Sequence, residues 1–161
     1  MKAVGIISII YGTLGILYGL ASLIMVSFTV NFLGFMPEYD AYMQGFDMEA
    51  YMWAIQGMMK IIMPLMIVVG GIYLWGGIVA VKKLAAVFHL RLAAILNIAW
   101  YCLYIYMFVT RVMPSLDSFF YGYGFSEMMN MVMIVALVFG GIFYCGYPIF
   151  LLIWLKKERN Y

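Results

Sequence analysis

Four long apolar stretches limit what this chain can fold into. They lie near residues 3–32, 59–81, 88–110 and 129–155. Each is longer than the ~20 residues that a helix needs to cross the hydrocarbon core of a bilayer. Hydrophobic residues make up 68% of the chain and charged residues only 10%, whereas about a quarter of the residues of a soluble domain are charged. We therefore predict an all-α integral membrane protein, in which residues 1–161 form one domain of four transmembrane helices.

The first apolar stretch follows Lys2, as the apolar part of a secretory signal would. However, it is much longer than the roughly 7–15 apolar residues of such a signal, and no small-residue cleavage site with a polar sequence behind it appears. We expect it to be an uncleaved first helix.

The basic residues predict how the helices are oriented. Four spans place both termini on one side of the membrane. That side would hold seven of the nine basic residues, namely Lys2, Lys82, Lys83, Arg91, Lys156, Lys157 and Arg159. The other side would hold Lys60 and Arg111 together with most of the acidic residues. Because cytoplasmic loops are enriched in Lys and Arg, we predict an antiparallel four-helix bundle in the cytoplasmic (inner) membrane with both termini cytoplasmic.

Small residues form a stripe along the first helix. Alternating spacings of three and four place six of them on one helix face, namely Gly5, Ser8, Gly12, Gly15, Gly19 and Ser22. The second helix carries Gly70 and Gly77 at a related spacing, and the fourth carries Ala136 and Gly140. In lipid, small residues allow close backbone contact where no hydrophobic force drives helices together. We predict that these faces pack helices, either within the bundle or against a partner.

Two prolines fall within the predicted spans. Pro64 lies in the expected first turns of the second helix, where a missing N–H costs little. Pro148 lies well inside the fourth helix. It should kink that helix near Tyr144 and leave a free carbonyl for neighbouring groups or a local adjustment to satisfy.

The two outer connections carry aromatic residues. Within 33–58, Asp47 is a suitable N-cap and Trp53 suits the membrane interface, so we expect a short helix over 47–55 at the outer surface. The second connection, 111–128, contains five closely spaced aromatic residues, namely Phe119, Phe120, Tyr121, Tyr123 and Phe125. They form either an interfacial aromatic belt or, together with Trp53, a surface for a partner.

Few residues are candidates for catalysis or for binding a metal or a cofactor. A single histidine excludes a bis-His haem site or a multi-His metal cluster within one chain, and we predict no cofactor and no metal. Cys102 and Cys145 fall about 10 Å apart in depth, so we expect free, buried thiols. Sixteen methionines lie mainly at helical spacing in apolar spans, which favours core filling over metal binding.

One polar stripe remains, on the third helix. His89, Asn97 and Tyr101 follow one another at steps of four or eight residues. We expect His89 to lie at the interface and Asn97 to join helices through a hydrogen bond. The alternative is that this stripe lines a pathway or holds a ligand ring.

The sequence therefore favours a non-enzymatic accessory or assembly subunit, which would pack beside another integral membrane protein or copies of itself in the lipid bilayer. A small channel or transporter that uses the Asn97–Tyr101 face is the alternative, and a membrane enzyme or cofactor binder is a third class. The basic residues are scattered along one membrane edge, which gives no support for nucleic-acid binding.

Overall fold

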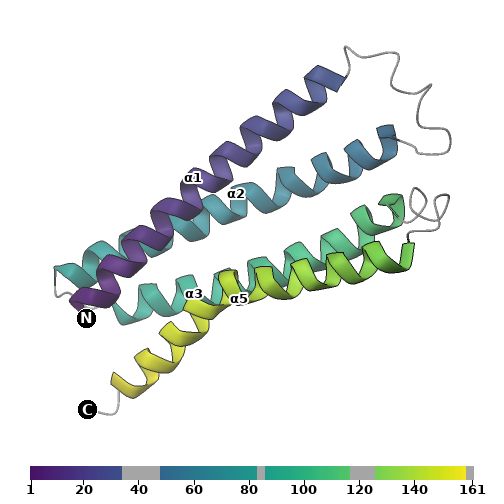
Figure 1. Ribbon diagram of the computed structural model, residues 1–161. Helices are drawn as coiled ribbons and strands as arrows, with labels where there is room; N and C mark the ends of the chain where they lie inside the picture. Colours follow the sequence, from purple (N-terminus) through teal and green to yellow (C-terminus); the bar gives the residue numbers. More distant parts are fainter. Residues whose placement is uncertain (34–47, 83–85, 117–125, 159–161) are drawn as a thin grey trace.

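The computed structural model describes residues 1–33, 48–82, 86–116 and 126–158. Nearly all of them are helical, in the segments α1 (Lys2–Leu33), α2 (Met48–Val81), α3 (Val87–Met107), η2 (Phe108–Val112) and α5 (Ser126–Glu158) (Figure 1). Within the described residues, four helices are long and apolar enough to cross a membrane. The all-helical class and the four spans are as the sequence predicts.

The second span starts earlier than expected. A single helix runs from Met48 to Val81, so the short surface helix expected over 47–55 is instead the first part of α2. Gly57 is the only weak helix former between residues 48 and 58, and one glycine is tolerated inside a helix. Pro64 therefore lies in the interior of α2, not in its first turns.

The third span also continues further than expected. After α3 the chain makes the π-helical turn η2 and remains helical over 113–116, so the second connection begins after the predicted residue 111. The N–H of Met113 bonds to the carbonyl of Phe108, five residues back. Pro114 follows directly and lacks an N–H, so the regular hydrogen-bond pattern is already interrupted here.

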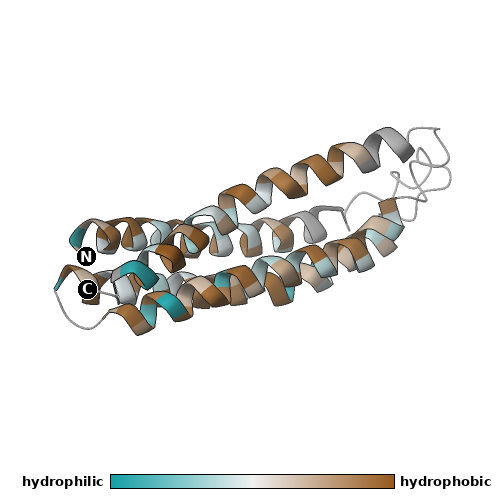
Figure 2. Ribbon diagram, turned by 90° about the horizontal axis from the view of Figure 1, so that it is seen from below, coloured by the Kyte–Doolittle hydropathy of each residue, from teal (hydrophilic) through white to brown (hydrophobic). Residues whose placement is uncertain are grey.

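Consecutive long helices run in opposite directions, and both termini lie at the same end (Figure 1). α1 packs along α2, α2 packs on α3, and α3 packs on α5. The first and last helices are outermost: 11% of the most apolar window of each is buried, against 44% for α2. Figure 2 shows apolar residues along the length of the helices and hydrophilic residues mainly toward the end with the termini.

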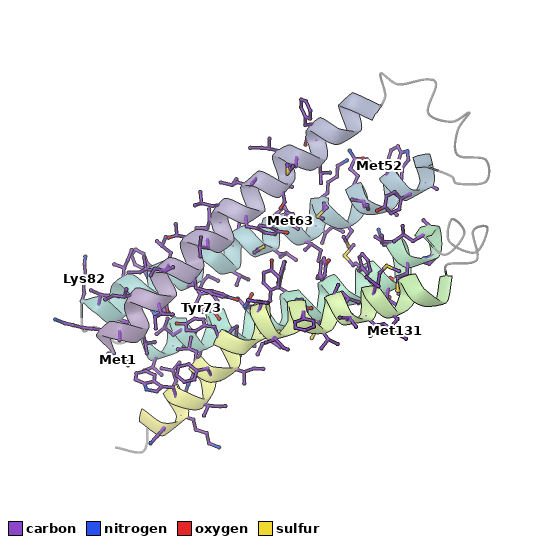
Figure 3. The ribbon with its side chains drawn as sticks, viewed as in Figure 1. Met1, Met52, Met63, Tyr73, Lys82 and Met131 are labelled. Atoms are coloured by element: carbon purple, nitrogen blue, oxygen red, sulfur yellow. The ribbon has the colours of Figure 1, made fainter. Side chains whose placement is uncertain are left out.

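Buried side chains form two clusters along the molecule. The cluster nearer the termini draws on all four helices and contains Tyr73, Leu90 and Leu151. The other is formed by α2, α3 and η2, and it includes Trp100. Methionines fill much of this second cluster, namely Met58, Met63, Met66 and Met107. These four have the predicted core-filling role, whereas Met131 of α5 is exposed (Figure 3).

Glycines bring α1 and α2 into backbone contact. A Cβ on Gly12 would lie 2.5 Å from the carbonyl oxygen of Gly70, and a Cβ on Gly70 would lie 2.8 Å from that of Gly12. Gly5 and Gly77 form a second reciprocal pair, with corresponding distances of 2.8 and 2.6 Å. Such distances are too short for any real side chain. We call these two pairs the glycine seam; the small-residue stripe is therefore used mainly inside the chain.

Candidate functional site

The kink in α5 creates a polar centre between three helices. Pro148 has no N–H, so the carbonyl of Tyr144 loses its helical partner. The Nδ2 amide of Asn97 donates to that carbonyl at 2.8 Å, and the hydroxyl of Tyr11 donates to it at 2.9 Å. Asn97 Nδ2 also donates to the Tyr11 hydroxyl at 2.9 Å. We call these groups the Asn97 node.

The node confirms two sequence predictions. Neighbouring helices satisfy the carbonyl that Pro148 frees, and Asn97 joins α3 to α1 and α5 through hydrogen bonds. Asn97 itself is buried. Figure 1 shows α5 changing direction in this part of the helix.

Further polar contacts toward the termini tie α5 to α1 and to α3. The fully buried hydroxyl of Ser8 in α1 lies 2.7 Å from that of Tyr147 in α5. Arg91 of α3 donates to the carbonyl of Leu155 in α5 at 3.1 Å. α1 and α5 are thus joined on the terminal side of the Asn97 node, mostly through side chains.

Beyond the node, the two outermost helices leave a cleft between them. It consists of a larger cavity of about 500 Å³ and a smaller one of about 260 Å³. Tyr18, Gly140 and Tyr144 line both cavities, so we treat them as one cleft. The larger cavity is lined by residues of all four long helices. Leu14 of α1 and Phe143 of α5 also line it and are 60% and 77% exposed, which places its opening between α1 and α5.

Aromatic rings form the wall of the smaller cavity. Two pairs stack nearly parallel: Trp100 on Tyr104, with ring centroids 6.1 Å apart, and Tyr101 on Tyr144, 5.9 Å apart. The indole N–H of Trp100 donates to the carbonyl of Ile62 at 2.7 Å. Hydrogen bonding and mutual stacking therefore hold these rings in place.

The small residues predicted on the fourth helix accommodate one of these rings. The Tyr101 hydroxyl donates to the carbonyl of Leu137 in α5. A Cβ on Gly140 would lie 2.9 Å from the Tyr101 hydroxyl oxygen, and one on Gly141 would lie 3.3 Å from its ring. Gly140 thus admits Tyr101, whereas Ala136 is exposed and lines the smaller cavity.

Tyr73 of α2 lines the larger cavity at its deep end. Its ring packs edge-to-face on Tyr11, with centroids 5.1 Å apart, and tilted on Tyr147, 6.0 Å apart. Figure 3 places Tyr73 between the α1–α2 pair and the α3–α5 pair. Tyr73 is fully buried, and its hydroxyl has no hydrogen-bond partner in the described part of the chain. Burying such a hydroxyl without a partner costs free energy.

The residues that line the two cavities carry no charge: Asp, Glu, Lys, Arg and His are absent from both linings within the described ranges. The polar groups there are tyrosine hydroxyls, the Asn97 amide, the Trp100 indole N–H and backbone. A charged ligand would lose its hydration without gaining a partner of opposite charge. The cleft therefore suits a neutral, largely apolar molecule.

Only part of the predicted polar stripe meets at the cleft. Asn97 lines the larger cavity and Tyr101 the smaller, and Tyr144 contacts both. His89 lines neither cavity; it is half-buried and packs edge-to-face on Phe88, with centroids 5.8 Å apart.

The two cysteines are free, as predicted. Cys145 is partly buried, but Cys102 is exposed, not buried as expected, because it lies on the face of α3 that is turned away from the other helices. Trp53 is exposed near the start of α2. The remaining residues of the predicted outer aromatic surface, Phe119, Phe120, Tyr121, Tyr123 and Phe125, lie outside the described residues.

Sequence reasoning missed most of the cleft. Tyr11 and Tyr18 are seven residues apart, which places them on one face of α1, and Tyr73 of α2 carries no sequence signal of its own. Two signals were available in the sequence. One is the seven-residue spacing of Tyr11 and Tyr18, and the other is the position of Tyr144, four residues before Pro148.

Comparison with known proteins does not place this chain in a family. No family model, no curated protein and no solved structure matches it.

Proposed function

We propose that this chain is a non-enzymatic, multi-pass membrane protein that binds a neutral apolar molecule from the bilayer in the cleft between α1 and α5. The observation that carries the proposal is an uncharged, aromatic-lined cleft that opens sideways between two membrane-length helices. Its larger cavity of about 500 Å³ lies within the ~300–1,000 Å³ typical of ligand sites.

This proposal develops the transporter alternative at its binding step. The Asn97–Tyr101 face contributes two wall residues, and the other helices contribute the rest. We also propose that both termini of the bundle are cytoplasmic. The described basic residues near the terminal end support this orientation, namely Lys2, Lys82, Arg91, Lys156 and Lys157.

Binding can be tested with fluorene, a flat and uncharged three-ring hydrocarbon. The purified protein is placed in phosphatidylcholine nanodiscs, and retained fluorene is compared with that in empty discs. We expect saturable retention by the wild type. A Gly15→Phe variant should reduce it at least tenfold, because Gly15 lines the larger cavity and its Cβ would meet only ordinary contacts, 3.7 Å from Gly70 Cα.

Gly71→Phe is the matched control. Gly71 lines neither cavity, and a Cβ there would meet nothing within 4 Å, so this variant adds the same ring outside the cleft. It should retain fluorene like the wild type. Equal retention by protein-containing and empty discs would overturn the proposal, and so would equal retention by both phenylalanine variants.

The accessory-subunit hypothesis remains a second proposal. The outermost helices offer such a partner large exposed apolar side chains, such as Ile24 in α1 and Phe139 and Phe150 in α5. Extraction from native membranes into nanodiscs, followed by mass measurement, should then yield a defined complex with another membrane protein or with further copies. Recovery of single copies alone would contradict it.

A further inference from the structure

The buried hydroxyl of Tyr73 indicates which polar group the ligand carries. We infer that the cleft takes a flat, neutral ring compound with a carbonyl oxygen, and that this oxygen accepts a hydrogen bond from Tyr73. The inference rests on the proposed function, because it concerns the same cleft.

The neighbouring donors are already engaged. Asn97 Nδ2 donates both to the Tyr11 hydroxyl and to the Tyr144 carbonyl, and Tyr11 itself donates to that carbonyl. The Tyr147 hydroxyl is paired with Ser8. Among these groups only the Tyr73 hydroxyl has no partner within the described ranges. A phenol hydroxyl can both donate and accept a hydrogen bond; we assign it the donor role here, with a ligand acceptor as its partner.

The position of Tyr73 sets how such a ligand would lie. Its side chain lines the larger cavity beside the rings of Tyr11 and Tyr147, and its hydroxyl oxygen is buried, so a ligand reaches it only if these rings move. The carbonyl oxygen would enter first, with a small displacement of these rings. The flat body would then lie toward the stacked rings that line the smaller cavity, among them Trp100 and Tyr104. Offset stacking between aromatic rings favours a planar ligand there.

The uncharged lining narrows the ligand class further. A carboxylate or an amine would enter this cavity without a counter-ion, whereas a ketone brings an acceptor at a much smaller cost of dehydration. A hydrocarbon of the same shape would fit but would leave the Tyr73 hydroxyl unpaired.

Two probes separate the contribution of a ligand carbonyl to binding from that of the ring skeleton. Fluorenone and fluorene share one three-ring skeleton, and only fluorenone has a ketone oxygen. Both are measured in nanodiscs with the wild type, with Tyr73→Phe and with Tyr106→Phe, in which the hydroxyl is lost from an exposed residue of α3 that lines neither cavity. We expect Tyr73→Phe to weaken fluorenone binding about five- to tenfold, the typical effect of one hydrogen bond, and to leave fluorene binding unchanged. Tyr106→Phe should change neither.

Infrared spectroscopy provides a second readout. The carbonyl stretch of bound fluorenone should lie at lower frequency in the wild type than in empty discs, and this shift should disappear in Tyr73→Phe. An unshifted band in the wild type would overturn the inference. Equal weakening of both probes, or no weakening of either, would also overturn it while leaving the proposed function intact. Failure of Tyr73→Phe to fold would show that the hydroxyl has a structural partner, which contradicts the inference. If the wild type retains neither probe, the proposed function itself fails.

Discussion

The two sides of α1 pack in opposite ways. On the side of α2, Gly5 and Gly12 carry no side chain, so the backbone of α1 approaches the carbonyl oxygens of Gly77 and Gly70 directly. On the side of α5, Tyr11 and Tyr18 face a helix whose backbone stays further away, and a cleft remains. The same helix thus closes one interface and leaves another open. In lipid, the size of the side chains decides which of the two forms, because apolarity alone does not distinguish them.

Substitution in the glycine seam should have the largest effect. Gly12→Leu would place a Cβ 2.5 Å from the Gly70 carbonyl oxygen and 2.7 Å from the Leu74 backbone nitrogen. Backbone atoms cannot move aside cheaply, so α1 and α2 must separate. We expect a loss of about 3 kcal/mol or more in the free energy of unfolding, measured by denaturation with a strong detergent.

Gly71→Leu provides the control for the seam, because nothing lies within 4 Å of a Cβ at Gly71. This variant should unfold within about 0.5 kcal/mol of the wild type, as surface substitutions usually do. Equal destabilisation by the two leucines would mean that the reciprocal glycine contacts do not hold α1 to α2.

Substitution of Asn97 should lower the free energy of unfolding by less than Gly12→Leu does, and the size of this loss should depend on Pro148. Asn97→Leu removes the hydrogen bonds to Tyr11 and to the Tyr144 carbonyl, and we expect it to cost about 1–2 kcal/mol. Pro148→Ala restores an N–H that can bond to that carbonyl. In the Pro148→Ala background the cost of Asn97→Leu should therefore fall by about half.

A double-mutant cycle of unfolding free energies measures this coupling. Additive effects of the two substitutions would show that Asn97 does not compensate for the proline. The node would then be a set of independent contacts and not the support of the kinked helix.

The smallest effect on stability is expected at Tyr73. Its hydroxyl has no partner in the described part of the chain, so Tyr73→Phe removes an unpaired polar group without opening a cavity. We expect the ligand-free variant to be as stable as the wild type or up to about 1 kcal/mol more stable. A thermal melt in nanodiscs checks this. A clear loss of stability would show that the Tyr73 hydroxyl makes a stabilising contact, and that the helices around the cleft are more closely packed than we propose.

The fold was largely predictable and the cleft was not. Apolar stretches longer than a bilayer predict four spans, and Pro148 with Asn97 predicts the kink and its interhelical hydrogen bond. The start of α2 was misplaced because no strong helix breaker lies between residues 48 and 58. The glycine stripe predicts close packing but does not say against which helix.

The cleft was missed for a physical reason. In a soluble protein, polar and apolar faces indicate what lies inside, but in lipid both faces of a helix are apolar. Tyr18 of the cleft and Tyr106 of the outer surface therefore look alike in the sequence, and only the packed helices distinguish them.

The most direct test of an open, ligand-accessible side of α1 is photolabelling with a diazirine-bearing fluorene in nanodiscs, with the adducts located by mass spectrometry. We predict labelling of Met63, Tyr104 and Tyr144 that excess unlabelled fluorene suppresses, because these residues line the smaller cavity. Labelling of exposed residues such as Trp75 and Phe150 should persist, since they lie outside both cavities. Adducts confined to such exposed residues and unaffected by competitor would contradict the account.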